Sequence, residues 1–74
     1  MSDAERRLCD WQYHRSGHFF TALFELMTKA DGKNLARLSI GFPEEGQAFH
    51  LFRNDESYWP ALKAEYTGGK GDVA

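Results

Sequence analysis

The stretch that decides the fold runs from residue 19 to residue 30 and reads FFTALFELMTKA. Its large apolar side chains recur every three to four residues, which is the period of an α-helix with a buried face. The apolar face is wider than a surface helix needs. We therefore expect this helix to lie at the centre of the core. Asp31 and Gly32 are expected to end it, with Gly32 in the left-handed conformation that closes many helices.

A second helix is expected on the N-terminal side, from about Asp3 to about Arg15. Ser2 and Glu5 have the spacing of a capping box, in which each side chain accepts a hydrogen bond from the backbone N–H of the other residue. The Ser-Gly pair at 16–17 then breaks this helix and offers an N-cap to the next one. The two helices are therefore joined by a short polar connection.

Gly, Pro and polar residues divide the C-terminal half into short segments. We expect helices over residues 33–40, from Pro43 to about Arg53, and from Ser57 or Pro60 to about residue 67. No run of β-branched residues and no alternating stretch indicates a strand. The sequence therefore predicts an all-α fold, a compact bundle of four to five short helices. We expect a single domain at residues 1–67 and a flexible tail at 68–74.

Pro43, Glu44 and Glu45 have the pattern of a helix start. Proline is favoured at the first helical position, and carboxylates in the first turn complement the helix dipole. Neighbouring helical residues point about 100° apart, so these two glutamates do not form a general acid–base pair. Gly46 is unusual inside a helix, where it costs about 1 kcal/mol relative to alanine. Either it allows a neighbouring backbone to approach closely, or it has no special role.

Length and composition limit how the fold can be stabilised. A chain of 74 residues forms one domain, and a core of this size supplies only about 3–5 kcal/mol. Cys9 is the only cysteine, so no disulfide can form within the chain. We expect its thiol to be buried and structural, because no catalytic motif surrounds it. The six Phe, three Tyr and two Trp supply apolar area, and self-association could bury more.

Charge and hydropathy argue against several functional classes. The net charge of −2 differs from the basic character of most small nucleic-acid-binding domains. No apolar run approaches the roughly 18–20 residues that span a bilayer, and no signal peptide is expected. A lone cysteine suggests a cytoplasmic protein. His14 and His18 have a metal-ligand spacing, but residues 16–17 interrupt the helix and a third ligand is missing, so we expect no metal or cofactor.

Aromatic and basic residues gather at two places as candidates for an interaction surface. The candidate residues are Arg7, Trp11, Arg15, His18, Tyr58 and Trp59. The planar guanidinium groups of arginine and stacked aromatic rings suit an anionic ligand such as a nucleotide, and exposed aromatic residues suit a protein partner. The alternative in both places is a solvated helix face with rings that close the core.

Four short motifs carry a resemblance to a known group of proteins. They are F-T-A-L-F at 20–24, K-A-D at 29–31, G-F-P-E-E at 41–45 and Y-W at 58–59. This pattern resembles a group of short uncharacterised proteins from bacteria, prophages and tailed phages. The resemblance covers a little over half of the chain, and it departs at Gly46, where an ordinary helix former would be expected. It implies a small accessory protein of a phage or mobile element and implies no activity.

We therefore expect a non-enzymatic interaction protein that binds a protein partner and self-associates. The reason is that the chain has more large apolar residues than one small core can hide. The alternative is an oligomer that sequesters a nucleotide-type molecule in phage counter-defence, a role taken from the resemblance. Arg6, Arg7, Arg15 or His18 would then line pockets between subunits. We expect no enzyme activity, because no nucleophile–base pair or metal set is present.

Overall fold

The computed structural model describes residues 1–68 and shows α-helices joined by short loops. The helices are α1 (Asp3–Gln12), α2 (His18–Lys29), α3 (Gly32–Gly41), α4 (Pro43–Asn54) and α5 (Tyr58–Tyr66). No strand occurs in the described part of the chain, so the predicted all-α bundle is confirmed. Apart from Gly68, the tail predicted at 68–74 lies outside the described residues.

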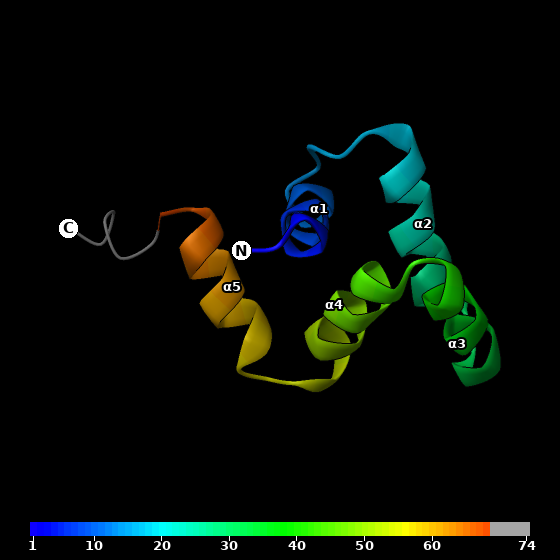
Figure 1. The fold of residues 1–74 in the computed structure, drawn as a ribbon. Helices are drawn as coiled ribbons and strands as arrows, with labels where there is room; N and C mark the ends of the chain where they lie inside the picture. The colour runs from blue at the N-terminus through cyan, green and yellow to red at the C-terminus, as the bar shows by residue number, and fades with distance from the viewer. Residues whose placement is uncertain (69–74) are drawn as a thin grey trace.

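The centre of the bundle is α4. It packs against each of the other four helices, whereas α2 packs mainly against α1 and α4. Figure 1 shows α4 between α5 on one side and the pair α2 and α3 on the other. The prediction that the other helices pack around the helix at 19–30 was wrong, although this helix contributes the fully buried Phe24 and Met27 to the core. The width of an apolar face is visible in a sequence, but which part of that face is covered depends on packing.

Two helix ends differ from the prediction. α1 ends at Gln12 rather than near Arg15, and His14 follows with a φ of 58°, a left-handed conformation that few non-glycine residues adopt. Gly32 does not close α2 but is the first residue of α3. Asp31 is extended and caps α3, accepting a 2.8 Å hydrogen bond from the backbone N–H of Asn34. The cap of the following helix thus decides the conformation of this junction.

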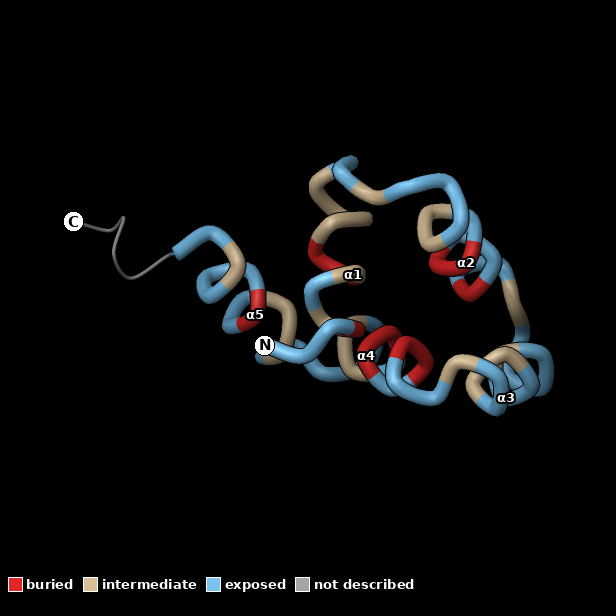
Figure 2. Tube along the Cα trace, turned by 45° about the horizontal axis from the view of Figure 1, so that its top comes forward, coloured by how far each residue is buried: buried red, intermediate tan, exposed pale blue. Residues whose placement is uncertain are grey.

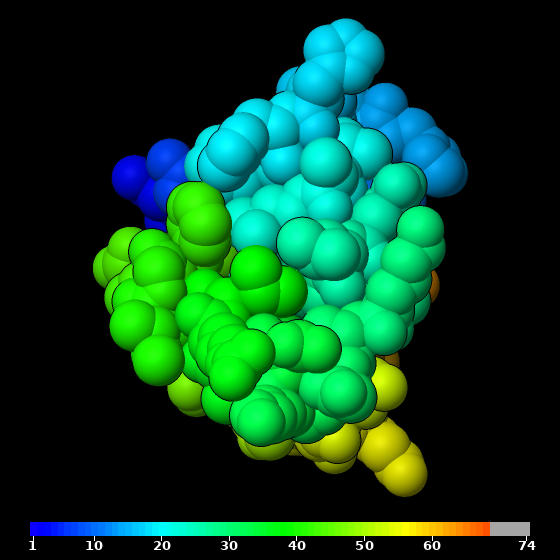
Figure 3. Space-filling view, turned by 90° about the vertical axis from the view of Figure 1, so that its right-hand side faces the viewer, coloured from blue at the N-terminus to red at the C-terminus, as the bar shows by residue number. Residues whose placement is uncertain are grey.

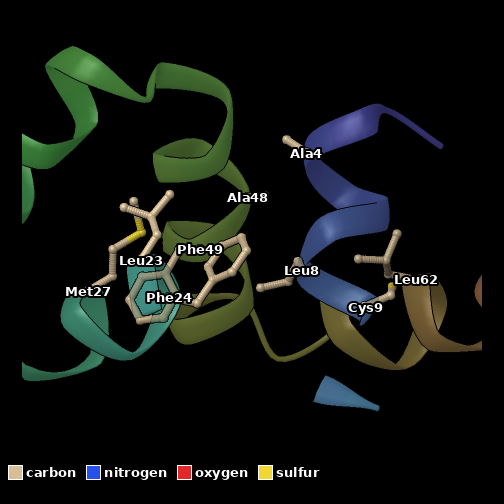
Figure 4. Packing of buried hydrophobic residues seen from close by; sticks show 9 residues of the cluster. All are labelled: Ala4, Leu8, Cys9, Leu23, Phe24, Met27, Ala48, Phe49 and Leu62. Atoms are coloured by element: carbon tan, nitrogen blue, oxygen red, sulfur yellow. The ribbon is translucent and has the colours of Figure 1, made fainter. Parts of the chain in front are cut away.

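The core is one cluster of apolar residues from four helices. Phe24 of α2 lies beside Phe49 of α4, and Leu8 of α1 points toward Phe49, while Cys9 lies beside Leu62 (Figure 4). The buried residues are Ala4, Leu8, Cys9, Leu23, Phe24, Met27, Ala48, Phe49 and Leu62. Figure 2 shows buried positions on α1, α2, α4 and α5, whereas α3 has none. α3 is therefore the outermost helix of the bundle.

Two tyrosine hydroxyl groups join α5 to α1. Tyr58 donates a hydrogen bond to Glu5 at 2.9 Å, and Tyr66 donates one to Asp10 at 2.6 Å. The carboxylate of Glu5 also accepts from the backbone N–H of Ser2, which confirms the predicted capping box. Together the Ser2 N–H and the Tyr58 hydroxyl hold the pKa of Glu5 below its ordinary value. Polar contacts thus help to hold α5, which buries only one residue.

α3 lies close against α4 at Gly46. A Cβ atom at position 46 would lie 2.7 Å from the Cβ of Ser39 and 3.1 Å from its Cα, and nearer still to its Oγ. Real Cβ atoms essentially never come within 3.0 Å of such neighbours. Of the two explanations that the sequence left open for this glycine, the close approach of a neighbouring backbone is confirmed.

Gly46→Ala is therefore expected to lower the free energy of unfolding by about 1–2 kcal/mol. The added methyl group overpacks the α3–α4 contact, and this outweighs the gain of about 1 kcal/mol in helix propensity. Urea unfolding followed by circular dichroism measures the change. Gly41→Ala is a suitable control, since a Cβ at position 41 meets nothing within 4 Å. Ser39→Gly combined with Gly46→Ala should recover part of the loss, and a stabilised Gly46→Ala single variant would contradict the expectation.

Candidate interaction surface

α2 has two apolar sides, and only one of them is buried. Phe24 and Met27 point into the core and are fully buried. On the other side, Phe19 is 61% exposed and Leu26 is 51% exposed. Positions 19 and 26 are two helical turns apart and therefore lie on the same face. Two large apolar side chains of α2 are thus left in contact with solvent.

This exposed side of α2 faces α3 across a groove. One hollow of about 250 Å³ is lined by Phe19, Ala22, Leu23, Leu26, Leu38 and Phe42. A second hollow, of about 360 Å³, is lined by Leu26, Lys29, Ala30, Asn34, Arg37 and Leu38. The two hollows adjoin at Leu26 and Leu38, which line both, and together they are called here the α2–α3 groove. Figure 3 looks onto this face, with α2 in cyan to teal and α3 in green side by side.

The two ends of the α2–α3 groove differ in chemistry. At one end the ring of Phe19 packs against Phe20 and Phe42, with centroid distances of 5.1 and 5.7 Å. At the other end lie Lys29 and Arg37, which form no ion pair with any residue of the described range 1–68. No Asp or Glu is among the residues that line either hollow. The groove is therefore apolar along its length and cationic at one end.

The predicted candidate Arg7 is bound by a buried carboxylate. Its Nη1 donates to Oε2 of Glu45 at 2.7 Å, and its guanidinium group lies 4.6 Å from the centroid of the Phe20 ring. Glu45 is only 6% exposed. The sequence predicted only a dipole-complementing role for this glutamate, and it carried no signal for a partner 38 positions away. Arg7 thus connects α1 to α4 and α2.

The three predicted aromatic candidates pack against the core and are half-buried. Trp11 stacks on Phe24 with a centroid distance of 5.2 Å, and Trp59 meets Phe52 edge-on at 5.4 Å. Burial and a hydrogen bond to a carboxylate raise the pKa of the Tyr58 hydroxyl. These contacts support the alternative in which the rings close the core.

The remaining candidates, Arg15 and His18, are exposed near the connection of α1 to α2. The guanidinium group of Arg15 lies 5.9 Å from the ring centroid of Tyr13, and His18 is the first residue of α2. Arg6 is also exposed, whereas Arg7 is already paired. Arg7 is thus used within the fold, and a nucleotide site built from the predicted residues stays a prediction.

Cys9 is fully buried, which confirms its predicted position. Burial raises the pKa of its thiol to about 11, so the thiolate, which is the nucleophilic form, is scarce at neutral pH. Within residues 1–68, no group of three or more His, Cys, Asp or Glu side chains has a metal-binding arrangement. In the same range, none of the helices has the length and apolar character needed to cross a membrane.

No protein-family model matches the sequence, and comparisons with curated proteins and with solved structures likewise find no match. The resemblance to phage and prophage proteins therefore stays a prediction. The α2–α3 groove itself was not predicted. Its only signal in the sequence was the excess width of the apolar face at 19–30, together with the basic residues Lys29 and Arg37 nearby.

Proposed function

We propose that this chain is a small non-enzymatic interaction protein that binds a protein partner in the α2–α3 groove. The observation that carries the proposal is the exposure of Phe19 and Leu26 in one continuous apolar hollow. Contiguous apolar surface is unfavourable in water, and on small proteins it commonly marks a binding site. On the resemblance described above, we further propose an accessory role in a phage or mobile element.

The shape of the groove favours a protein over a small molecule. Small-molecule sites generally bury most of the ligand surface in a closed cleft. The α2–α3 groove lies on the surface between two helices, so an occupant would keep one side in contact with water. A segment of a protein with one apolar and one polar side satisfies both conditions. The buried thiol of Cys9, whose pKa is raised, is poorly suited to act as a nucleophile.

Native mass spectrometry of the protein, purified gently from its own cells, tests the proposal. We expect the wild-type chain of 8.5 kDa to retain a second polypeptide, and Leu26→Gln to lose it. Ile40→Gln is the matched control, because Ile40 is 81% exposed but does not line the groove. Both changes replace an exposed aliphatic side chain by glutamine, so neither should alter the circular dichroism spectrum.

Each measured mass that differs from this expectation leads to a different conclusion about the binding surface. A bare monomer for the wild type would contradict the proposal. If only Ile40→Gln loses the partner, the binding surface lies on the outer side of α3 and not in the groove. Multiples of 8.5 kDa would establish the self-association that the sequence predicts. An oligomer with the added mass of a nucleotide would favour the sequestering alternative.

A further inference from the structure

The length of the α2–α3 groove suits a short helix. Along α2 it runs from Phe19 to Lys29, a distance of about 15 Å at 1.5 Å per residue, or nearly three helical turns. Its apolar part, between Phe19 and Leu26, covers two of these turns. Helices that dock in grooves place apolar side chains at i, i+4 and i+7, which span the same length. The groove therefore matches one face of an amphipathic helix.

The helix dipoles account for only one of the two cations at this end of the groove. Lys29 lies in the last turn of α2, where a positive charge complements the helix dipole. Arg37 lies in the middle of α3, so the dipole gives no reason for it. The acidic residues closest in sequence, Glu25 and Asp31, do not line the groove, and Asp31 is used as the cap of α3. Two unpaired cations thus face the groove.

A second copy of this chain, placed groove against groove, would not supply the missing negative charge. The residues lining the two hollows include no Asp or Glu, so the cationic end of each copy would meet no carboxylate in the groove of the other. Charge complementarity therefore favours a different protein as the occupant.

From these observations we infer that the α2–α3 groove receives an amphipathic α-helix of a partner protein, with carboxylates at the end that meets Lys29 and Arg37. The inference rests on the proposed function and specifies the class of partner. The apolar side chains of the partner helix lie against Phe19, Leu26 and Leu38. Its polar side stays in water, and its acidic residues pair with the two cations.

A display library of helical peptides tests this inference on the full chain. The library has apolar residues at i, i+4 and i+7 and equal proportions of Glu, Gln and Lys at two positions on each flank. On the wild type, we expect Glu to be enriched over Lys roughly tenfold at one flank, as two exposed ion pairs would produce. Lys29→Glu/Arg37→Glu should reverse this preference. Leu26→Glu should abolish recovery of the library while its circular dichroism spectrum stays unchanged.

The outcomes separate this inference from the proposed function. If peptide binding requires Leu26 but Glu is not enriched at either flank, or Lys is enriched instead, the inference of an acidic partner helix is overturned. The groove then remains a binding site. Recovery that is unaffected by Leu26→Glu would overturn both. A concentration-dependent dimer in sedimentation velocity that Leu26→Glu disrupts would place a second copy in the groove and overturn the inference.

Discussion

Phe24→Ala is expected to leave the chain largely unfolded, whereas Phe19→Ala on the same helix is expected to leave it folded. Phe24 is fully buried and stacks on both Trp11 and Phe49, with centroid distances of 5.2 and 6.5 Å. Removing a buried phenylalanine side chain costs about 3–5 kcal/mol, through lost apolar burial and the cavity left behind. A core of this size supplies about 3–5 kcal/mol in total, so the loss consumes most of the stability.

The comparison of the two phenylalanines separates core packing from groove chemistry. Phe19 is 61% exposed, so its truncation should change the free energy of unfolding by no more than about 0.5 kcal/mol. Thermal unfolding followed by circular dichroism at 222 nm distinguishes the two variants directly. A cooperative transition in Phe24→Ala close to that of the wild type would mean that the stacked rings are not the centre of the core.

Arg7→Met is expected to destabilise the fold by about 2–3 kcal/mol. Methionine keeps an apolar stem beside Phe20 but leaves the carboxylate of Glu45 buried without its cation. Breaking a fully buried ion pair costs about 3–5 kcal/mol. We expect a smaller loss here because the Arg7 side chain is 38% exposed and the site is therefore partly solvated. Arg6→Met is the matched control, since Arg6 is exposed and takes part in neither ion pair of residues 1–68.

Replacing both members of this pair should restore most of the stability. Arg7→Met/Glu45→Met substitutes apolar side chains of similar size for the two charges, and such replacements are often neutral or stabilising. Urea unfolding of the two single variants and the double variant gives the coupling free energy between the two positions. If the double variant is as unstable as the sum of the singles, the contact at 2.7 Å contributes no coupling to the fold.

Local signals in the sequence gave the helix starts correctly, because caps act over a few residues. The capping box of Ser2 and Glu5 and the proline at position 43 each lie where a helix begins. Where two local signals competed, at Asp31 and Gly32, the sequence did not show which one would dominate. The aspartate cap of α3 prevailed over a glycine end for α2.

Contacts between distant parts of the chain could not be predicted in the same way. The pairing of Arg7 with Glu45 and the central place of α4 depend on how the helices pack, which no short pattern encodes. The same holds for the candidate site. Periodicity showed that the apolar face of the helix at 19–30 is wide, but only the packed structure shows that Phe19 and Leu26 stay uncovered.

The two walls of the α2–α3 groove are unequal in local stability. α2 is anchored by three buried residues, whereas α3 buries none and is held mainly by its contact with α4. Segments that bury few apolar side chains open at a lower free-energy cost than the rest of a domain. The backbone amides of α3 should therefore exchange with solvent before those of α2. The groove thus has one fixed wall and one wall that can move, so its width can adjust to the side chains that enter it.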